Sequence, residues 1–238
     1  MRILDIDMDF FQSEIHNNDT DSNSHLENEN FKVWNEKIFI DFIENKCGLS
    51  KESKIKGRVF DHHVDTYWFA KELIDTYLLT VPFDLTHIDA HSDMGFSASV
   101  PYYKFLDTFS KENKDAFENG TLFENVENQR YIDFGNYINA MALNRWLSKI
   151  EYVYHDKLDY LDFPEYIIEP DQTKKGFAFR YNFISKAIIP NLTIYAMDKE
   201  NYCFTQPYDY ICVAISPSFT VKEIEPLVEI IKQYIVEI

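Results

Sequence analysis

The residues best suited to chemistry are acidic and imidazole side chains that recur at every second position. The densest run is His87-Ile88-Asp89-Ala90-His91-Ser92-Asp93. Alternate side chains of an extended strand point to the same face, so the two histidines and two aspartates share one face if the strand continues that far. Carboxylates and imidazoles without thiolates suit Mn²⁺, Fe²⁺ or Zn²⁺. The run therefore predicts a metal site.

A second acidic run lies at the start of the chain, in Asp5-Ile6-Asp7-Met8-Asp9. The spacing is again two, which places the three carboxylates on one face of a strand. Like charges held this close repel each other unless a cation neutralises them. The flanking residues are apolar, so we expect a buried cation here rather than a solvated strand end.

A third group, Asp61-His62-His63, follows the apolar residues 58–60. One of the two histidines is expected to complete the site, and spacing alone does not choose between them. Together the three groups offer more ligands than one ion needs. This supply suits two ions that share bridging carboxylates, about 3.5–4 Å apart, and activate a water.

The elements that position these groups follow from apolar spacing. Strands are expected at residues 2–7, 58–60, 85–89, 152–154, 192–197 and 210–215. Helices are expected from residue 34 to Gly48 and at residues 66–79, 137–147 and 224–235. The last helix begins either at a capping box of Thr220 and Glu223 or at a first turn marked by Pro226.

Alternating strands and helices predict an α/β protein with a three-layer, mostly parallel, doubly wound sheet and one domain over residues 1–238. Such folds place their sites at the carboxyl ends of the strands. The polar segment from Gln12 to Asn30 directly follows the first strand. It is predicted to be either a disordered surface loop or a lid that orders over substrate.

Composition excludes several classes. The net charge of −17 leaves no basic footprint for nucleic acid and instead favours cationic ligands. The three cysteines have no metal-binding or disulfide spacing, and none of the six glycines forms a phosphate-binding motif. No segment resembles a signal peptide or a membrane span, so we expect a cytoplasmic protein.

The motifs resemble those of a known superfamily, which contains arginase, agmatinase and formiminoglutamase. Residues 89–93 are similar to its Asp-Ala-His-x-Asp motif, residues 5–7 to its Asp-x-Asp strand and residues 61–62 to its Asp-His turn. The closest likeness is to the peptide arginase branch, which acts on arginine residues of ribosomally made peptides. That branch shares the elements Asp61-His62-His63, His87 to Asp93, Asp5 to Phe11, Gly135-Asn136 and Ser216-Pro217.

The departures from ordinary arginases bear on the substrate. The Asp-x-Asp strand opens this chain, as in a circular permutation, and the loop that binds the α-groups of free arginine is missing. The acid that grips the guanidinium has no clear match, and Ser218 stands where it is expected. These differences favour a peptide over free arginine.

The resemblance implies a metal-dependent guanidino hydrolase with two Mn²⁺ ions per chain. It leaves two registers for the first strand and favours Asp7 and Asp9 as ligands, with Asp5 behind them. The branch places its histidine two residues after the acid, which favours His63 over His62. The remaining implied ligands are Asp89, His91 and Asp93.

The implied reaction converts an arginine side chain of a peptide to ornithine and releases urea. Asp89 and His91 hold the reacting centre, and Asp93 relays a proton to the leaving amine. Asn136 either positions substrate or caps the helix that follows it. His87 is expected to support the ligands, and His155 to be an ordinary packed histidine rather than a proton shuttle.

Three other functions are also compatible with the sequence. An Asp-His-His-type Mn²⁺-dependent phosphoesterase also combines an Asp-x-Asp strand with an Asp-His-His turn. A zinc amide hydrolase resembling histone deacetylases uses one ion and one Asp-x-His pair. The third is a metal-bearing binding protein without activity. Counting the bound ions separates the second from the two-metal readings.

Overall fold

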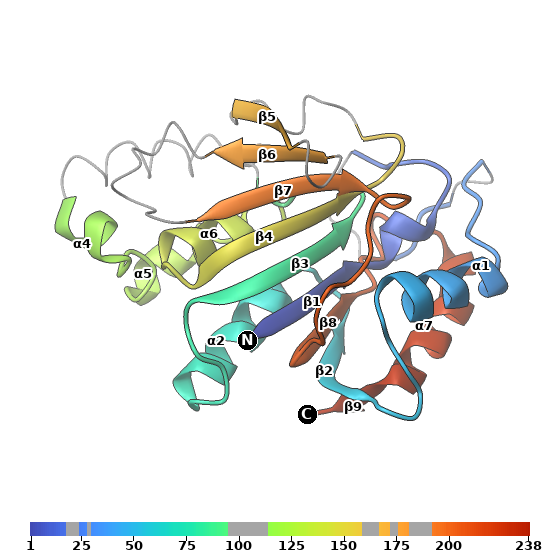
Figure 1. Cartoon of the computed structure of the whole chain (residues 1–238), viewed down its shortest axis with the longest axis horizontal. Coiled ribbons are helices and arrows are strands. Elements are labelled where there is room, and N and C mark those ends of the chain that lie inside the picture. Colours follow the sequence, from blue (N-terminus) through green and yellow to red (C-terminus); the bar gives the residue numbers. More distant parts are fainter. Residues whose placement is uncertain (18–23, 28–29, 95–113, 159–166, 172–175, 181–191) are drawn as a thin grey trace.

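The computed structural model describes residues 1–17, 24–27, 30–94, 114–158, 167–171, 176–180 and 192–238. These residues form a nine-stranded sheet in the order β5-β6-β7-β4-β3-β1-β8-β2-β9 (Figure 1). The seven strands from β7 to β9 are parallel, whereas β6 and β5 extend one edge in antiparallel fashion. Their bounds are β1 (Arg2–Asp7), β2 (Ile55–Phe60), β3 (Phe83–Asp89), β4 (Leu147–Tyr154), β5 (Ile167–Asp171), β6 (Gly176–Arg180), β7 (Thr193–Asp198), β8 (Tyr210–Ala214) and β9 (Ile235–Glu237).

Helices lie on both faces of this sheet, which agrees with the predicted three-layer α/β class (Figure 1). One face carries α2 (Asp65–Asp75) and α6 (Tyr137–Leu143), with α4 (Lys114–Asn119) and α5 (Val126–Gln129) beyond them. The opposite face carries α1 (Glu36–Asp41), the π-helical turn η2 (Phe42–Lys46) and α7 (Glu225–Ile231). Short 3-10 turns complete the set: η1 (Met8–Phe11), η4 (Lys222–Ile224) and η5 (Lys232–Tyr234).

Strand β1 shows how the two cores divide. All six of its residues are buried, because helices cover the sheet on both sides. Ile3 packs in the core under α2 and α6, whereas Leu4 and Ile6 pack in the core under α1 and α7. Side chains alternate along the strand, so Asp5 and Asp7 lie on the same face as Ile3, toward α2 and α6.

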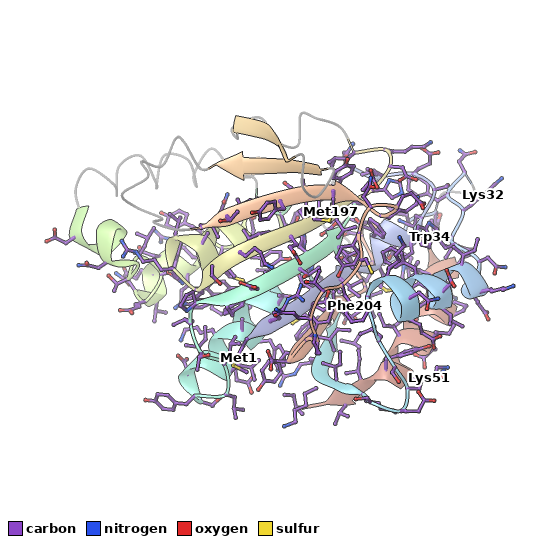
Figure 2. All side chains as sticks on the ribbon, viewed as in Figure 1. Met1, Lys32, Trp34, Lys51, Met197 and Phe204 are labelled. Atoms are coloured by element: carbon purple, nitrogen blue, oxygen red, sulfur yellow. The ribbon has the colours of Figure 1, made fainter. Side chains whose placement is uncertain are left out.

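The chain order around β1 creates the place for a site. From β1 the chain reaches β2 on one side, with β8 between them, and then β3 on the other side. Such a switch point is where open parallel sheets bind ligands, beyond the carboxyl ends of the strands. The register sets Asp5 beside His87, and both Asp7 and Phe60 beside Ala214. The three chemical groups therefore meet at one edge. Figure 2 shows this end of the molecule near Trp34 and Met197, away from Met1.

The six predicted strands are all present, and β2, β3 and β4 begin earlier than expected. Strands β5, β6 and β9 were not predicted. The third predicted helix was too long, because α6 ends at Leu143 and Leu147 opens β4. Arg145 has a φ of 58°, a left-handed conformation that ends the helix and turns the chain into the strand.

Helix ends account for the other differences. The first helix ends as predicted, with Gly48 at a φ of +71° directly after Cys47. The helix from Asp65 stops at Asp75, before the predicted Leu79. Pro226 lies in the first turn of α7, as one alternative predicted, and no side chain caps η4 or α7, so the capping box is not formed.

The last helix was predicted to extend to Ile235, which was wrong, because Ile235 belongs to the edge strand β9. Among the described residues, no helix has the length and apolarity that a bilayer crossing requires.

Candidate metal centre

Three carboxylates converge on one ring nitrogen at the carboxyl edge of the sheet. The Nδ1 atom of His63 lies 3.1 Å from Asp7 Oδ2, 3.0 Å from Asp89 Oδ2 and 2.9 Å from Asp93 Oδ2. This nitrogen is buried and forms no hydrogen bond in the described structure, and neither does Asp89 Oδ2. Two such atoms that lie 3.0 Å apart without a hydrogen bond could both be ligands of one cation. We call these four residues the first cluster.

A second cluster lies beside the first and consists of Asp9, Asp89 and His91. The Nδ1 atom of His91 is 3.0 Å from Asp9 Oδ2 and 3.7 Å from Asp89 Oδ1. Asp89 thus offers Oδ2 to the first cluster and Oδ1 to the second. A carboxylate shared in this way is the feature expected where two cations lie next to each other.

The backbone brings Asp7 and Asp9 together by a turn and not by strand spacing. Strand β1 ends at Asp7, whose side chain accepts a hydrogen bond from the N–H of Asp9 and caps the turn η1. Asp9 also accepts a hydrogen bond of 3.3 Å from the N–H of Ala90. Asp9 was predicted to extend the strand, but it lies in a 3-10 turn. Its side chain nevertheless belongs to the second cluster.

The second run departs from the strand in the same way. Strand β3 ends at Asp89, as predicted, so it does not continue to Asp93 and strand alternation does not place all four side chains on one face. The N–H of His91 donates to Asp89 Oδ1 at 2.7 Å, and Asp93 has a φ of 46°. Positive φ is uncommon for residues other than glycine and clusters at functional sites. This turn folds His91 and Asp93 back over Asp89.

Asp5 lies under the clusters and is saturated with donors. Its Oδ1 accepts from His63 Nε2 at 3.1 Å and Thr66 Oγ1 at 2.9 Å, and its Oδ2 accepts from His87 Nδ1 at 2.9 Å and the Tyr137 hydroxyl at 2.6 Å. A carboxylate has about four lone-pair sites. All are occupied, so Asp5 lies behind the ligands as a common acceptor for their rings, although Asp5, His63 and His87 also form a group that could hold an ion.

The hydrogen bonds determine which nitrogen of each ligand histidine carries the proton. His91 Nε2 lies 3.0 Å from the carbonyl oxygen of His16, which only accepts, so Nε2 holds the hydrogen. In the neutral ring Nδ1 is then unprotonated and faces Asp9 and Asp89. The same reasoning applies to His63, because its Nε2 lies against the Asp5 carboxylate. Both rings are thereby set to offer Nδ1 to a metal.

His87 has a different role. Its Nδ1 bonds to the Asp5 carboxylate, and its Nε2 lies 3.2 Å from the carbonyl oxygen of His91. Both nitrogens face acceptors, which fits a doubly protonated ring. Burial lowers the pKa of His87, but Asp5 and Asp89 outweigh burial, and the net shift is upward. His87 therefore connects Asp5 to the backbone of His91, and it also belongs to two groups that could hold an ion, with Asp5 and His63 and with Asp89 and Asp93.

Burial and mutual contact shift the pKa values of the clustered side chains. Burial, followed by the charges of Asp7 and Asp89, raises the pKa of Asp9 well above its ordinary value. Burial and then Asp89 raise the pKa of Asp93 to about 7. Burial lowers the pKa of His63, but Asp5 and Asp7 raise it well above its ordinary value. Burial tends to raise the pKa of Asp89 as well, but hydrogen bonds from His63 and His91 outweigh it and lower that pKa. The buried acidic groups are thus strongly coupled to one another and to the histidines, as is typical of residues gathered around a cation.

The other predicted residues lie as follows. His62 is exposed and belongs to neither cluster, so its prediction as an alternative ligand was wrong and His63 occupies that position. Asn136 is buried; its side chain accepts from the N–H of Asp133 at 3.1 Å and donates to the carbonyl of Tyr131 at 3.0 Å. It braces the loop before α6 and does not cap that helix through its side chain.

The Ser-Pro turn contributes a residue that the sequence did not assign. Ser216, at a φ of 49°, donates its hydroxyl to Asp7 Oδ2 at 2.5 Å. Ser218, the predicted substrate position, is half-buried in the same turn. Tyr137 and Thr66 were also not predicted to belong to the site. The only sequence signal was position: Tyr137 directly follows Gly135-Asn136, and Thr66 lies three residues after His63.

The described part of the polar segment packs against the site. Gln12 donates through Nε2 to the carbonyl of Phe219 at 2.9 Å and accepts through Oε1 from the N–H of Val221 at 2.8 Å. Leu26 forms a parallel bridge with Val221. Residues 18–23 and 28–29 of the segment lie outside the described residues. His155 bonds to the carbonyl of Gln12 at 2.9 Å, as expected of an ordinary packed histidine.

The sequence matches no family model, and comparison with curated proteins and with solved structures gives no match either. The likeness to arginases therefore rests on the motifs, and the case for a metal centre rests on the two buried clusters that share Asp89.

Proposed function

We propose that the chain is a dimanganese hydrolase that converts arginine side chains of a peptide to ornithine and releases urea. The observation that supports this function best is the sharing of Asp89 between two adjacent clusters. One ion would be held by Asp7, His63, Asp89 and Asp93, and the other by Asp9, Asp89 and His91. Carboxylate and imidazole ligands without thiolate suit Mn²⁺.

Two such ions, when bound, lower the pKa of a water between them and supply hydroxide near neutral pH. The chain's own residues would then orient the ligands and carry the proton. Asp5 and the carbonyl of His16 fix the ring orientation of the two ligand histidines. Asp93 is the proposed proton carrier, because it belongs to the first cluster alone and leaves Asp89 to bridge.

A peptide substrate is favoured over free arginine by the sequence, which lacks the loop that holds the α-groups of the free amino acid. The net charge of −17 also favours a cationic partner. The ribosomal origin of the peptide is part of the proposal and rests on the resemblance to the peptide arginase branch.

The two rival hydrolases fit this geometry less well. An Asp-His-His phosphoesterase would draw on Asp61, His62 and His63 together, but Asp61 and His62 are exposed and only His63 reaches the clusters. A deacetylase-like zinc enzyme needs one ion, whereas this edge of the sheet offers two ligand sets that share one carboxylate.

The test is urea release from an arginine-containing peptide by the Mn²⁺-loaded protein, with bound metal counted by mass spectrometry. We expect two ions per chain in the unmodified protein. Asp89→Asn removes the shared ligand and is expected to lower urea release by at least about 100-fold, with loss of metal. Mutation of a residue that only hydrogen-bonds to a metal ligand already lowers metal affinity or activity by about 10- to 100-fold.

The chain offers a matched control in its adjacent histidines. His63→Ala is expected to abolish urea release, whereas His62→Ala, at the exposed neighbour, is expected to retain it. One tightly bound ion in the unmodified protein, or full urea release by Asp89→Asn, would exclude the proposed reaction. Phosphodiester turnover in place of urea release would support the phosphoesterase.

A further inference from the structure

An aromatic cluster flanks the second metal cluster on its solvent side. The ring of Phe219 lies 5.3 Å from the ring of His91, 5.6 Å from Phe134 and 6.2 Å from His16, measured between ring centroids. His16 in turn lies 6.5 Å from Phe31. We call Phe219, Phe134 and His16 the aromatic wall.

The wall lies where solvent reaches the metal ligands. The side chain of His91 is 21 % exposed, whereas those of the other ligands are 8 % exposed or less. Phe134 is 40 % exposed. The most exposed ligand, His91, therefore lies beside Phe219, which in turn contacts Phe134.

The backbone of the site holds the wall in place. The N–H of Phe219 donates to the carbonyl of Ser216 at 2.8 Å, and its carbonyl accepts from Gln12 Nε2 at 2.9 Å. Ser216 itself bonds to Asp7. These contacts use only the backbone of Phe219, so a change of its ring leaves them in place.

One polar atom in the wall lacks a partner. The Nε2 atom of His16 is buried and forms no hydrogen bond within the described structure. A buried ring nitrogen without a partner costs free energy unless a ligand supplies one. The backbone carbonyl of the same residue is already engaged with His91. The side chain and the backbone of His16 thus serve two separate contacts.

Flat cations fit such a surface. A guanidinium is planar and weakly hydrated and stacks on aromatic faces, and its N–H groups donate hydrogen bonds in the plane. Aromatic rings beside a buried ring nitrogen without a partner, which is an acceptor when the proton is on Nδ1, match both properties. An acyl chain would use the rings but leave the acceptor without a donor.

We propose that the aromatic wall is the specificity subsite for a guanidinium side chain, which stacks on Phe219 and Phe134 and donates to His16 Nε2. This inference rests on the proposed function, and it assigns to stacking the role that a carboxylate has in ordinary arginases. The substrate class is an exposed arginine residue, since the wall opens to solvent at Phe134.

The test measures KM and kcat for urea release from an acetylated, amidated Gly-Arg-Gly peptide. Phe219→Ala and Phe219→Leu are expected to raise KM by about 2- to 30-fold, the range of a cation–π contact, with kcat and bound Mn²⁺ nearly unchanged. His16→Ala should behave alike, because it keeps the carbonyl that orients His91. The control is Tyr77→Ala, at an aromatic residue 92 % exposed after α2.

Binding is measured separately, by anisotropy of a labelled peptide in an Asp93→Asn background, with norleucine in place of arginine as the apolar counterpart. The norleucine peptide is expected to bind at least about tenfold more weakly. Equal binding of the two peptides, or a KM for Phe219→Leu equal to that of the unmodified protein, would overturn the subsite. Selective arginine binding without urea release would leave the subsite standing and reject the reaction.

Discussion

Tyr137→Phe tests whether the hydrogen bonds beneath the clusters set metal affinity. The Tyr137 hydroxyl lies 2.6 Å from Asp5 Oδ2 and 2.9 Å from His63 Nε2, and the side chain is fully buried. Phenylalanine keeps the ring and removes only the oxygen, so the packing of α6 against the sheet is retained. The change therefore isolates the hydrogen bond from the fold.

The expected magnitude has two parts. A hydrogen bond to a buried charged group contributes about 1.5–3 kcal/mol, so the free energy of unfolding of the metal-free protein should fall by about that amount. Loss of a partner that orients a ligand histidine typically lowers metal affinity by about 10- to 100-fold. The metal-bound protein should then lose more stability than the metal-free protein at a fixed, limiting Mn²⁺ concentration, because binding to the folded state adds stability by mass action.

Thr66→Val is the matched control. Its hydroxyl donates to the same carboxylate at 2.9 Å, but it contacts Asp5 Oδ1 and no histidine ring in the described structure. Urea denaturation measures stability with and without Mn²⁺, and calorimetric titration measures affinity. We expect both variants to lose stability but Tyr137→Phe to lose far more affinity. Equal Mn²⁺ affinity for the two variants and the unmodified protein would refute the reasoning.

Two further predictions concern pH and packing. The pKa values of His63 and His91 are raised in the metal-free fold, so their stabilising contribution is complete below about pH 6.5 and is lost as pH rises through the folded values. Denaturation of the metal-free protein should show falling stability above that pH, while Mn²⁺ affinity rises as the rings lose protons; a flat profile would contradict this. Gly57→Ala would place a Cβ 1.9 Å from the carbonyl oxygen of Ile211, so we expect a loss of about 1–3 kcal/mol or more, and an unchanged denaturation midpoint would reject it.

Much of the site could be predicted from local sequence, because strand periodicity and like-charge repulsion act over a few residues. The spacing at Asp7, Asp9, Asp89, His91 and Asp93 identified every carboxylate and one histidine of the two clusters. The apolar runs identified six of the parallel strands, and the position of ligands at strand ends followed from the class of fold.

The conformations that deliver these ligands were decided by the fold. The sequence suggested continuous strands, but Asp9 lies in a 3-10 turn and Asp93 in a turn with positive φ. Hydrogen bonds across strand ends, such as that from Ala90 to Asp9, stabilise these turns, and no spacing rule contains them.

Tertiary structure also decided which of several similar neighbouring residues belongs to the clusters. His62 and His63 are equivalent in the sequence, yet the turn before α2 buries one and exposes the other. Asp5 resembles its neighbours Asp7 and Asp9, but donors from β3, α2, α6 and the turn at His63 fill its four acceptor sites.

Composition and local periodicity determined which acidic and imidazole residues stand at the ends of strands, because each strand's alternation depends only on its own side chains. Tertiary structure decided which of them face a cation, which support it and which remain in solvent. Tyr137 and Ser216 are 132 and 209 residues from the aspartates they bond, Asp5 and Asp7. Contacts of that kind exist only once the sheet has brought distant strand ends to one edge.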